Sequence, residues 1–502
     1  MKGKGETLYL FIVFHNKVPE APAEGFLLLT GRDLWRVPLG THLYYVRKGL
    51  VINMKVCKFG GTSMADAEQI RKVCSIVTSD PERRVVVVSA PGKRFDTDTK
   101  ITDMLIDCAG KFLNGGDFAA SLEAIKERYA EIARDLGLGN QIITDIENNL
   151  NTRLLFEYDS DEKLMDRMKA AGEDNAARLV AFYLKSLGFH AHYVNPRDAG
   201  LFLSDEYGNA RVLPQSYKNL LKLKEMEGIV IFPGFFGYSL SGDVVTFPRG
   251  GSDITGAILA AALEVEVYEN FNDVDSVFVA NPKLIKNPRP ISFLTYREMR
   301  ELSYAGFSVL HEETLEPVYQ KKVPVNIRNT NNPNAPGTFI TTTRDHTLTP
   351  VAGIAGDRGF CSININKYMM NREIGFGRKV LQILEEESVP FEHMPSGIDD
   401  ISVILRKKYM DDDKKSHIME RIAKELRVDS VGFEYDLALV MVVGEGMLHT
   451  VGIAGRVTKA LAMNGVNIRM INQGSSEVSI MLGVGEDDVD KAIVCIYDEF
   501  FK

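Results

Sequence analysis

The sequence predicts an α/β protein in which a large domain with a mostly parallel sheet precedes two copies of a smaller unit. Three observations support this fold class. Short apolar runs alternate with amphipathic helical segments after residue 54, as in parallel sheets covered on both faces. The C-terminal part matches itself at a constant offset, which indicates a duplication. A chain of 502 residues, 45% of them hydrophobic, is also too long for one ordinary domain.

Residues 1–53 are expected to be an extension outside these domains. They contain the only Trp and lack both helical and strand periodicity. The first clear strand-like run begins at about Met54. We therefore predict that the extension is dispensable.

Residues 54–345 carry the alternation and are predicted to form one large domain. Its clearest strand-like runs are Val85–Val88, Ala191–Val194, Gly228–Phe232 and Val265–Tyr268. Helical segments at 174–187 and 253–263 lie between such runs. This order predicts a mostly parallel sheet between two layers of helices.

The last part of the chain is a duplication. When Gly375 is aligned with Gly452 without gaps, similar residues fall opposite one another: Val380 and Val457, Leu384 and Leu461, Val389 and Val466, Gly397 and Gly474, Asp400 and Glu477, Ser402 and Ser479. Each copy has the order strand, helix, strand, strand, helix, which is close to a ferredoxin-like βαββαβ module. We place the first module at 350–426 and the second at 427–502.

Composition limits the classes of partner. The formal net charge of −9 gives no electrostatic reason to bind nucleic acid or an anionic membrane. No apolar run reaches the roughly 20 residues of a membrane span, and the N-terminus does not resemble a signal peptide. The five cysteines are scattered, without the spacing of a metal site or the density of a disulfide scaffold. A cytoplasmic protein with reduced thiols and small-molecule partners is expected.

One candidate phosphate site follows the first strand. The run Val56–Ser63 ends in Gly60 and Gly61 and leads into a helix with apolar positions Ile70, Val73, Cys74 and Val77. Glycines at a helix start let backbone N–H groups approach phosphate oxygens, and Lys58 can neutralise a phosphoryl group. The alternative is an ordinary strand-to-helix turn capped by Ser63. Neither candidate phosphate site has a P-loop or a dinucleotide-binding glycine pattern.

Two further segments place charged side chains at helix starts. In Phe247–Asp253, Arg249 precedes two glycines and is suited to bind a carboxylate through two hydrogen bonds. The alternative is that Ser252 or Asp253 caps the helix and Arg249 is a surface residue. Glu173 lies at another helix start, where it can bind an ammonium group or favour the helix dipole.

Together these segments resemble the aspartate kinases of the amino-acid kinase family, over essentially all of residues 54–502. The matching stretches are Lys58–Ser63, Gly172–Glu173, Pro233–Phe235, Arg249–Asp253, Asn272–Val274 and Val309–His311. The duplicated tail resembles the paired ACT domains of these enzymes, modules that bind free amino acids between subunits. The resemblance implies an amino-acid-kinase-like three-layer sandwich at 54–345 and ACT domains at 350–426 and 427–502.

The resemblance also implies roles for individual residues. The residues implied at the nucleotide are Lys58, Phe59, Gly60, Gly61, Asn272, Asp273, Phe278 and Lys283, and those implied at aspartate are Ser89, Thr102, Glu173, Arg249 and Ser252. Lys58 and Asp253 would form the catalytic centre, with no protein metal ligand implied. The position of Thr102 depends on an insertion after Ser89. The family often has Thr, Tyr and Arg at the positions of Asn272, Phe278 and Lys283, and some members carry Lys at that of Ser308.

These residues suit a simple phosphoryl transfer from ATP with Mg²⁺. A free carboxylate has a pKa of about 4, so the acceptor needs no general base. The reaction instead needs positioning and charge neutralisation, which Lys58, the glycine N–H groups and Mg²⁺ supply. Asp253 then orients a lysine or a metal-bound water. Arg249 and Glu173 would pair with the α-carboxylate and α-ammonium of L-aspartate, and the product would be 4-phospho-L-aspartate, the first step toward lysine, threonine and methionine.

The paired ACT domains imply feedback control and self-association. Lysine is the expected effector, with threonine as the alternative. The candidate effector residues are Met370, Arg372, Gly375, Glu392 and Asp400, whose acidic members suit a ligand with an extra ammonium group. Glu392 and Asp400 are alternatively solvated strand or turn residues. A homodimer through the ACT domains is expected, with pairing into tetramers left open.

Two other functions fit parts of the pattern. A different amino-acid kinase would act on glutamate, acetylglutamate, carbamate or a nucleotide. A catalytically silent amino-acid sensor would keep the fold and the ACT pair, but intact Lys58, Arg249 and Asp253 argue against it. A second activity as homoserine dehydrogenase is not expected, because the sequence ends at Lys502 without a dinucleotide domain.

Overall fold

A computed structural model describes residues 54–155, 158–307, 310, 312–347 and 349–502, together with two short strands near the N-terminus. The chain divides into two units, Met1–Ile52 and Asn53–Lys502. In the first unit, β1 (Pro38–Leu39) pairs antiparallel with β2 (His42–Leu43). The rest of the 1–53 extension lies outside the described residues, so its dispensability stays a prediction.

The second unit begins with an eight-stranded sheet in the order β10-β12-β11-β9-β3-β4-β6-β5. Every neighbouring pair is parallel except β11 and β12, which confirms the predicted, mostly parallel sheet. The strands are β3 (Lys55–Phe59), β4 (Arg83–Val88), β5 (Ala191–Tyr193), β6 (Ile229–Pro233), β9 (Val267–Asn272), β10 (Phe293–Thr295), β11 (Val325–Asn329) and β12 (Thr338–Thr341). A separate hairpin joins β7 (Phe236–Tyr238) and β8 (Val244–Thr246).

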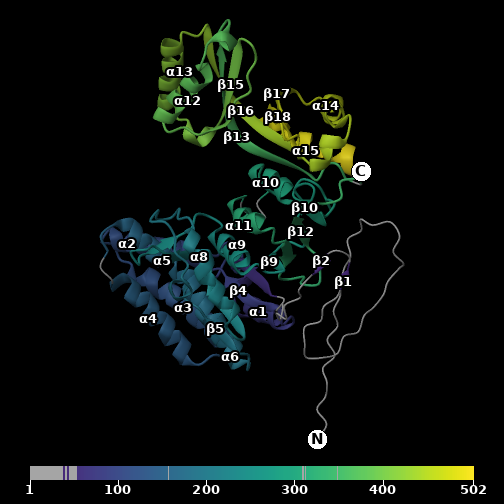
Figure 1. The fold of residues 1–502 in the computed structure, drawn as a ribbon. Helices are drawn as coiled ribbons and strands as arrows, with labels where there is room; N and C mark the ends of the chain where they lie inside the picture. Colours follow the sequence, from purple (N-terminus) through teal and green to yellow (C-terminus); the bar gives the residue numbers. More distant parts are fainter. Residues whose placement is uncertain are drawn as a thin grey trace. The chain divides into compact units, whose positions relative to one another are not determined.

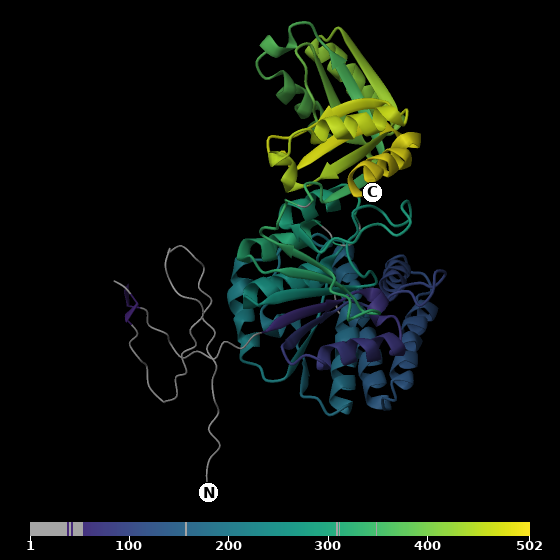
Figure 2. The same cartoon turned by 90° about the vertical axis from the view of Figure 1, so that its right-hand side faces the viewer.

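Helices cover both faces of this sheet (Figures 1 and 2). They are α1 (Ala67–Thr78), α2 (Ile101–Leu113), α3 (Ala119–Asp135), α4 (Asn140–Leu155), α5 (Asp161–Lys169), α6 (Ala171–Ser186), α7 (Pro196–Ala199), α8 (Pro214–Leu220), α9 (Gly251–Leu263), α10 (Tyr296–Tyr304) and α11 (Leu315–Lys321). Short 3₁₀ turns are η1 (Gly61–Met64), η2 (Leu221–Lys224) and η3 (Glu312–Thr314). Among the described helices, none combines the length and the apolarity needed to cross a membrane.

Two hydrophobic cores lie on opposite faces of the sheet, because successive strand residues point to opposite sides. Val56 and Val87 belong to the core that contains α9, whereas Cys57 and Val86 belong to the core that contains α1 and α6. The three-layer arrangement expected for 54–345 is therefore present.

A six-stranded antiparallel sheet follows, in the order β14-β15-β13-β16-β18-β17. Its strands are β13 (Gly353–Asn366), β14 (Phe391–His393), β15 (Asp400–Arg406), β16 (Ser430–Val443), β17 (Ile468–Asn472) and β18 (Ser479–Gly485). Its helices are α12 (Phe376–Glu386), α13 (Asp412–Leu426), α14 (Ile453–Met463) and α15 (Val489–Phe501), with 3₁₀ turns η4 (Met370–Arg372), η5 (Lys407–Tyr409), η6 (Glu445–His449) and η7 (Glu486–Asp488). The duplicated ferredoxin-like pattern is confirmed.

The two modules exchange strands through the long neighbours β13 and β16. The last part of β13, Phe360–Asn366, pairs with β15 on one side, and on the other side Ser362–Asn366 pairs with the start of β16, Ser430–Glu434. The start of β13, Gly353–Asp357, pairs with the end of β16, which itself pairs with β18. Each module therefore takes its fourth strand from the sequence range predicted for the other. The limits of the two modules in the sequence, 350–426 and 427–502, stay a prediction.

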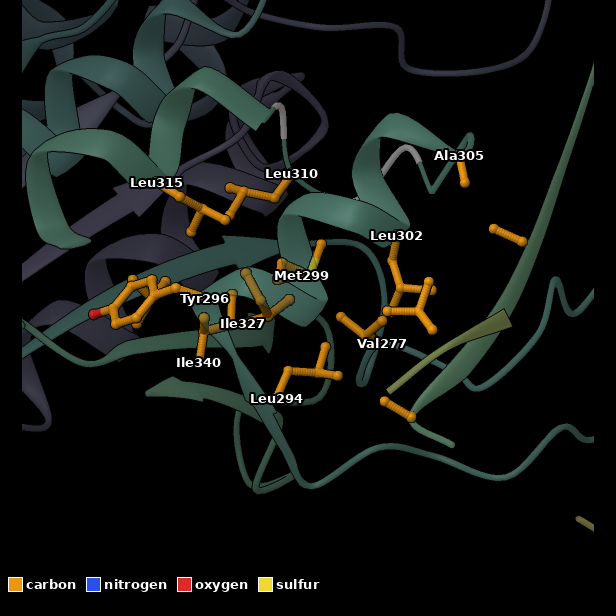
Figure 3. Packing of buried hydrophobic residues seen from close by; sticks show 14 of the residues in the cluster. Val277, Leu294, Tyr296, Met299, Leu302, Ala305, Leu310, Leu315, Ile327 and Ile340 are labelled. Atoms are coloured by element: carbon orange, nitrogen blue, oxygen red, sulfur yellow. The ribbon is translucent and has the colours of Figure 1, made fainter. Parts of the chain in front are cut away.

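Helix α10 packs where the first sheet meets the second (Figure 3). Met299 and Leu302 are fully buried in a core that also includes Val277, Leu294 and Ile354. Ile354 N donates to Val279 O at 2.7 Å. A Cβ atom on Gly353 would lie 3.0 Å from Leu302 Cδ2, so this strand approaches α10 closely.

Candidate active site

The candidate site lies at the edge of the large sheet where five parallel strands end. The strands β3, β4, β6, β9 and β11 are mutually parallel, so the loops that follow them start from one edge. In open α/β sheets this carboxyl edge is where ligands bind. The segments after Phe59, Val88, Pro233 and Asn272 contain most of the motifs that the sequence singled out.

The structure brings the first two motifs into direct contact. Lys58, which is buried in β3, places Nζ 2.5 Å from Asp253 Oδ1 in the first turn of α9. The two residues are almost 200 positions apart in the chain. Parallel strand order and the position of α9 over the sheet create this pair, which joins the glycine loop to the Arg249–Asp253 segment.

The glycine loop after β3 is locked to the loop after β4. Gly92 N donates to Gly61 O at 2.8 Å, and a Cβ atom on Gly92 would lie 2.6 Å from Gly61 C. Only glycine fits there without moving the backbone. At Gly60 an added Cβ would lie 3.7 Å from Lys58 Nζ and 3.7 Å from Asn272 Oδ1, so this glycine lies between two polar side chains.

Ser63 does not cap the helix that follows the glycines. Its Oγ is 2.7 Å from Thr330 Oγ1, and the residue is buried. Asp66 caps α1 instead, because its Oδ1 accepts a hydrogen bond from Gln69 N at 2.9 Å. The capping role that the alternative interpretation gave to Ser63 is therefore wrong.

Arg128 forms hydrogen bonds to both the segment after β3 and the loop after β4. The sequence analysis did not single out this residue. Its Nη2 donates to Ala65 O at 3.1 Å and to Gly92 O at 3.0 Å, while Nη1 lies 2.9 Å from Asp98 Oδ2. The signal that was available is a charged residue on the apolar stripe of α3, between the buried Ile125 and Ile132.

Glu173, in the first turn of α6, supplies a buried carboxylate next to the loop after β4 and the start of α9. Burial raises its pKa to about 7, although hydrogen bonds from the Ala90 backbone and the Ser252 side chain oppose the shift. Its Oε2 has no hydrogen-bond partner within the described part of the chain. A Cβ atom on Gly172 would lie 2.7 Å from Ala90 Cβ, so α6 packs closely on the loop after β4.

The neighbouring Asp174 shows what a paired carboxylate looks like in the same helix. Burial acts to raise its pKa, but Arg153 and Arg178 hold the pKa below its usual value. Arg153 Nη2 lies 2.8 Å from Asp174 Oδ2. Glu173 forms no ion pair with a described residue, and the charge of Lys100 opposes the raised pKa without cancelling it, so the environment of Glu173 suits a positively charged ligand.

Of the other candidate aspartate residues, Ser252 contacts the Glu173 carboxylate, and the rest lie in the loops and helix starts nearby in the chain. Ser252 is buried in the first turn of α9, and a Cβ atom on Gly234 would come within 2.7 Å of Ser252 Cβ. Ser89 is half-buried directly after β4, and Thr102 is half-buried at the second residue of α2. Arg249 is exposed before α9, and no ion pair of its guanidinium is found within the described residues.

The remaining candidate nucleotide residues lie at the end of β9 and in the segment that follows it. Asn272 ends that strand half-buried, and Asp273 follows it exposed. Phe278 forms an isolated bridge with Pro290, whereas Lys283 is exposed. Ser308 lies outside the described residues. Among the described residues, no group of three His, Cys, Asp or Glu side chains is arranged to hold a metal ion.

The five candidate effector residues occupy different environments. Met370 is buried in the core of the first module, and Gly375 precedes α12 in a left-handed conformation with φ 77°. Asp400 lines a cavity of about 310 Å³ on the six-stranded sheet. Arg372 closes the 3₁₀ turn η4. Glu392 is engaged elsewhere, because it accepts hydrogen bonds from the Tyr304 hydroxyl of α10 and from Arg406.

Comparisons with known proteins agree with this geometry. Residues 53–329 match the amino acid kinase family, and residues 440–500 match an ACT domain. The sequence is 56% identical over 448 residues to Aspartokinase 3 of Bacillus subtilis, covering 89% of this chain and 99% of that protein.

Solved structures give the same picture. The aspartate kinase of Clostridium acetobutylicum superposes with a TM-score of 0.79 at 39% identity, over 89% of this chain and 100% of that one. Aspartokinase III of E. coli superposes with a TM-score of 0.72 at 25% identity, with the same coverage of both chains. That enzyme has been solved with aspartate and ADP in an R-state, and with lysine and aspartate in a T-state.

Proposed function

Because this chain belongs to the amino acid kinase family and, within it, to the aspartokinases, we propose that it transfers the γ-phosphoryl group of ATP to the side-chain carboxylate of L-aspartate. The product would be 4-phospho-L-aspartate. The observation that carries the proposal is a buried lysine at a glycine loop, paired with Asp253, at the same sheet edge as the buried carboxylate of Glu173, whose Oε2 has no hydrogen-bond partner among the described residues.

The phosphate side of the site consists of Lys58 and the backbone of Gly60 and Gly61. Backbone N–H groups and a helix start favour anionic oxygens, and Lys58 adds a full positive charge. ATP phosphates would draw Lys58 away from Asp253. Mg²⁺ would be held mainly by the ATP phosphates and water, where it would neutralise phosphate charge, and Asp253 is suited to orient Lys58 or a metal-bound water.

The amino-acid side consists of Glu173, Ser252, Ser89, Thr102 and Arg249. An α-ammonium group beside Glu173 would favour its ionised form and lower the pKa that burial has raised. Arg249 is suited to the α-carboxylate through two parallel hydrogen bonds. With both α-groups held, the side-chain carboxylate remains for attack on phosphorus and needs no base.

Feedback control by an end-product amino acid extends the proposal. The lysine-bound T-state of the E. coli enzyme favours lysine over threonine as the effector. Lysine would bind near the η4 turn and Asp400 in a homodimer formed through the ACT domains. Inhibition requires lysine to bind a low-activity state more tightly, and aspartate must then weaken lysine binding by the same factor.

A coupled ADP-release assay tests the function. The protein should release ADP from ATP when aspartate is present, and it should not do so with glutamate, with asparagine or in buffer alone. Asparagine is the matched control, since it keeps both α-groups and lacks only the side-chain carboxylate. ADP release with asparagine, or none with aspartate, would refute the proposal. Activity should also be titrated with lysine, threonine and both, at low and at saturating aspartate, to test the identity of the effector. The assignment of lysine is wrong if threonine inhibits and lysine does not.

A further inference from the structure

A third residue completes the Lys58–Asp253 pair. Asn270 is fully buried in β9, and the parallel register sets it opposite Lys58 of β3. Its Nδ2 donates to Asp253 Oδ1 at 2.8 Å, and Lys58 Nζ lies 2.5 Å from the same oxygen. One carboxylate oxygen therefore has two donors, one cationic and one neutral.

The backbone around this oxygen is held tightly. The Tyr268 hydroxyl donates to Asp253 O at 3.1 Å and lies 3.4 Å from Asn270 Nδ2. Burial raises the pKa of Tyr268 well above its ordinary value, so this hydroxyl stays a donor. A Cβ atom on Gly256 would lie 2.4 Å from Tyr268 Oη, so α9 rests directly on the ring. The start of α9 is thereby anchored to β9.

We propose that Asn270 is a positioning residue that keeps the Asp253 carboxylate in place when Lys58 turns from it toward the phosphates of ATP. This rests on the proposed role of Lys58 at the phosphates. Without Asn270, Asp253 would keep no side-chain donor among the described residues once Lys58 left, and a partly buried carboxylate without a partner is unfavourable. A neutral amide holds the carboxylate without competing with Lys58 for the phosphates.

A filling role in the sheet does not explain this side chain. Asn270 Oδ1 is buried without a hydrogen-bond partner in the described residues, which carries a free-energy cost that an apolar side chain would avoid. Leucine has a similar size and suits a buried strand. The amide therefore gains its shortest hydrogen bond, to Asp253, at some cost to the stability of the fold.

The decisive experiment compares Asn270→Leu with Asn326→Leu. Asn326 is a matched control, because it is also a buried asparagine in a strand of this sheet, and its Oδ1 also has no hydrogen-bond partner among the described residues. It lies in the adjacent strand β11, where it is opposite Glu269 in the register. Removing a hydrogen bond to a charged group should lower kcat about 10- to 100-fold. KM for ATP should rise, because Lys58 becomes the one side-chain partner of Asp253 that remains among the described residues. KM for aspartate should change less than about twofold in Asn270→Leu. In the control Asn326→Leu, kcat and both KM values should also change less than about twofold.

A second variant keeps the size of the side chain and tests the donor itself. Asn270→Asp has no N–H donor and sets two carboxyl groups beside each other, which raises the apparent pKa of the pair. The described charged or titratable groups around them are Lys58 from β3, Asp253 from α9 and Tyr268 from β9. As pH falls, the introduced carboxyl gains a proton and can donate, so kcat relative to wild type should rise.

The outcomes separate the two claims. If wild type releases ADP with aspartate while Asn270→Leu matches Asn326→Leu, the positioning role is refuted and the function stands. A pH-independent ratio for Asn270→Asp also refutes the role, and this variant decides the matter if Asn270→Leu fails to fold. If wild type shows no aspartate-dependent ADP release, the proposed function fails first and the inference fails with it.

Discussion

The two sheets of the chain use the same kinds of element in different ways. In the eight-stranded sheet, parallel strands bring their following loops to one edge, and Lys58, Ser89 and Asp273 gather there. In the six-stranded antiparallel sheet, the long strands β13 and β16 run through both modules. The first arrangement concentrates chemistry at an edge. The second makes two modules structurally dependent on each other.

The comparison extends to charged groups. In the catalytic region the buried Glu173 forms no ion pair with a described residue and leaves Oε2 without a hydrogen-bond partner there, whereas its neighbour Asp174 is paired with Arg153. In the C-terminal region Glu392 is tied to Tyr304 and Arg406. A buried carboxylate without an ion pair is therefore a stronger candidate for a ligand position than one that neighbouring side chains already hold.

The largest expected effect concerns strand exchange. A fragment of residues 427–502 should remain largely unfolded, because it lacks Gly353–Asp357, which closes its module. A fragment of residues 349–502 contains both long strands and should fold and unfold in one transition. Far-UV circular dichroism and thermal unfolding check this. A cooperative transition for 427–502 alone would show that the modules are independent.

Lys58→Ala should lower kcat about 1,000-fold, because it removes the cation proposed for the phosphates. KM for aspartate should change little. Steady-state kinetics check this, with Lys55→Ala as the control on the same strand. Lys55 pairs with Asp80 and Glu82 at the opposite end of β3, so its loss should leave kcat unchanged. Equal effects of the two substitutions would place the phosphate site elsewhere.

Arg249→Ala should raise KM for aspartate about 10- to 100-fold, since it removes the proposed two-point contact with the α-carboxylate. The ATP constants should stay near wild type. Arg211→Ala removes another exposed arginine, one that pairs with Glu206, and serves as the control. An unchanged KM for aspartate would move the carboxylate site away from Arg249.

The proposed role of Glu173 should make aspartate binding pH-dependent. Its pKa of about 7 in the free enzyme means that protonation below that pH removes the partner of the α-ammonium group. KM for aspartate should rise as pH falls below 7, approaching about tenfold per pH unit. Glu173→Gln should have a high KM without this dependence. A wild-type KM that is flat between pH 6 and 8, taken as roughly one unit on either side of the pKa, would contradict the role.

The same carboxyl should affect stability in the opposite sense from Asp174. A raised pKa means that the folded state of the unliganded protein gains relative stability as pH falls from 7 toward the ordinary value of 4.5. Glu173→Gln should therefore raise Tm at pH 8. Asp174→Asn should lower it, because the depressed pKa of Asp174 reflects stabilising partners that are lost on substitution. Thermal unfolding without substrate distinguishes them.

The smallest effect is expected for removal of residues 1–53. A chain starting at Met54 keeps β3 and every candidate site residue. Its kcat and KM values should stay within about twofold of wild type. Kinetics and soluble yield of the truncated chain check this, and loss of either would show that the extension supports the domain.

The sequence was sufficient where a function depends on local backbone pattern. Glycines at a strand end, strand–helix alternation and the repeat in the C-terminal part are visible within short windows, because they reflect φ/ψ needs and periodic burial. Gly60, Gly61 and the Arg249–Asp253 segment were found in this way. The same patterns predicted the three-layer domain and the paired modules.

Tertiary structure decided which of these residues meet and how the modules close. Asn270 and Arg128 lie in the middle of a strand and a helix, so only the packing of β3, α9, α3 and the loops gives them partners. The exchange of β13 and β16 was likewise hidden, since strand pairing depends on which edges are free in the folded sheet and not on order in the chain. Contacts between distant segments arise from packing, and a single sequence records only the local preferences of each segment.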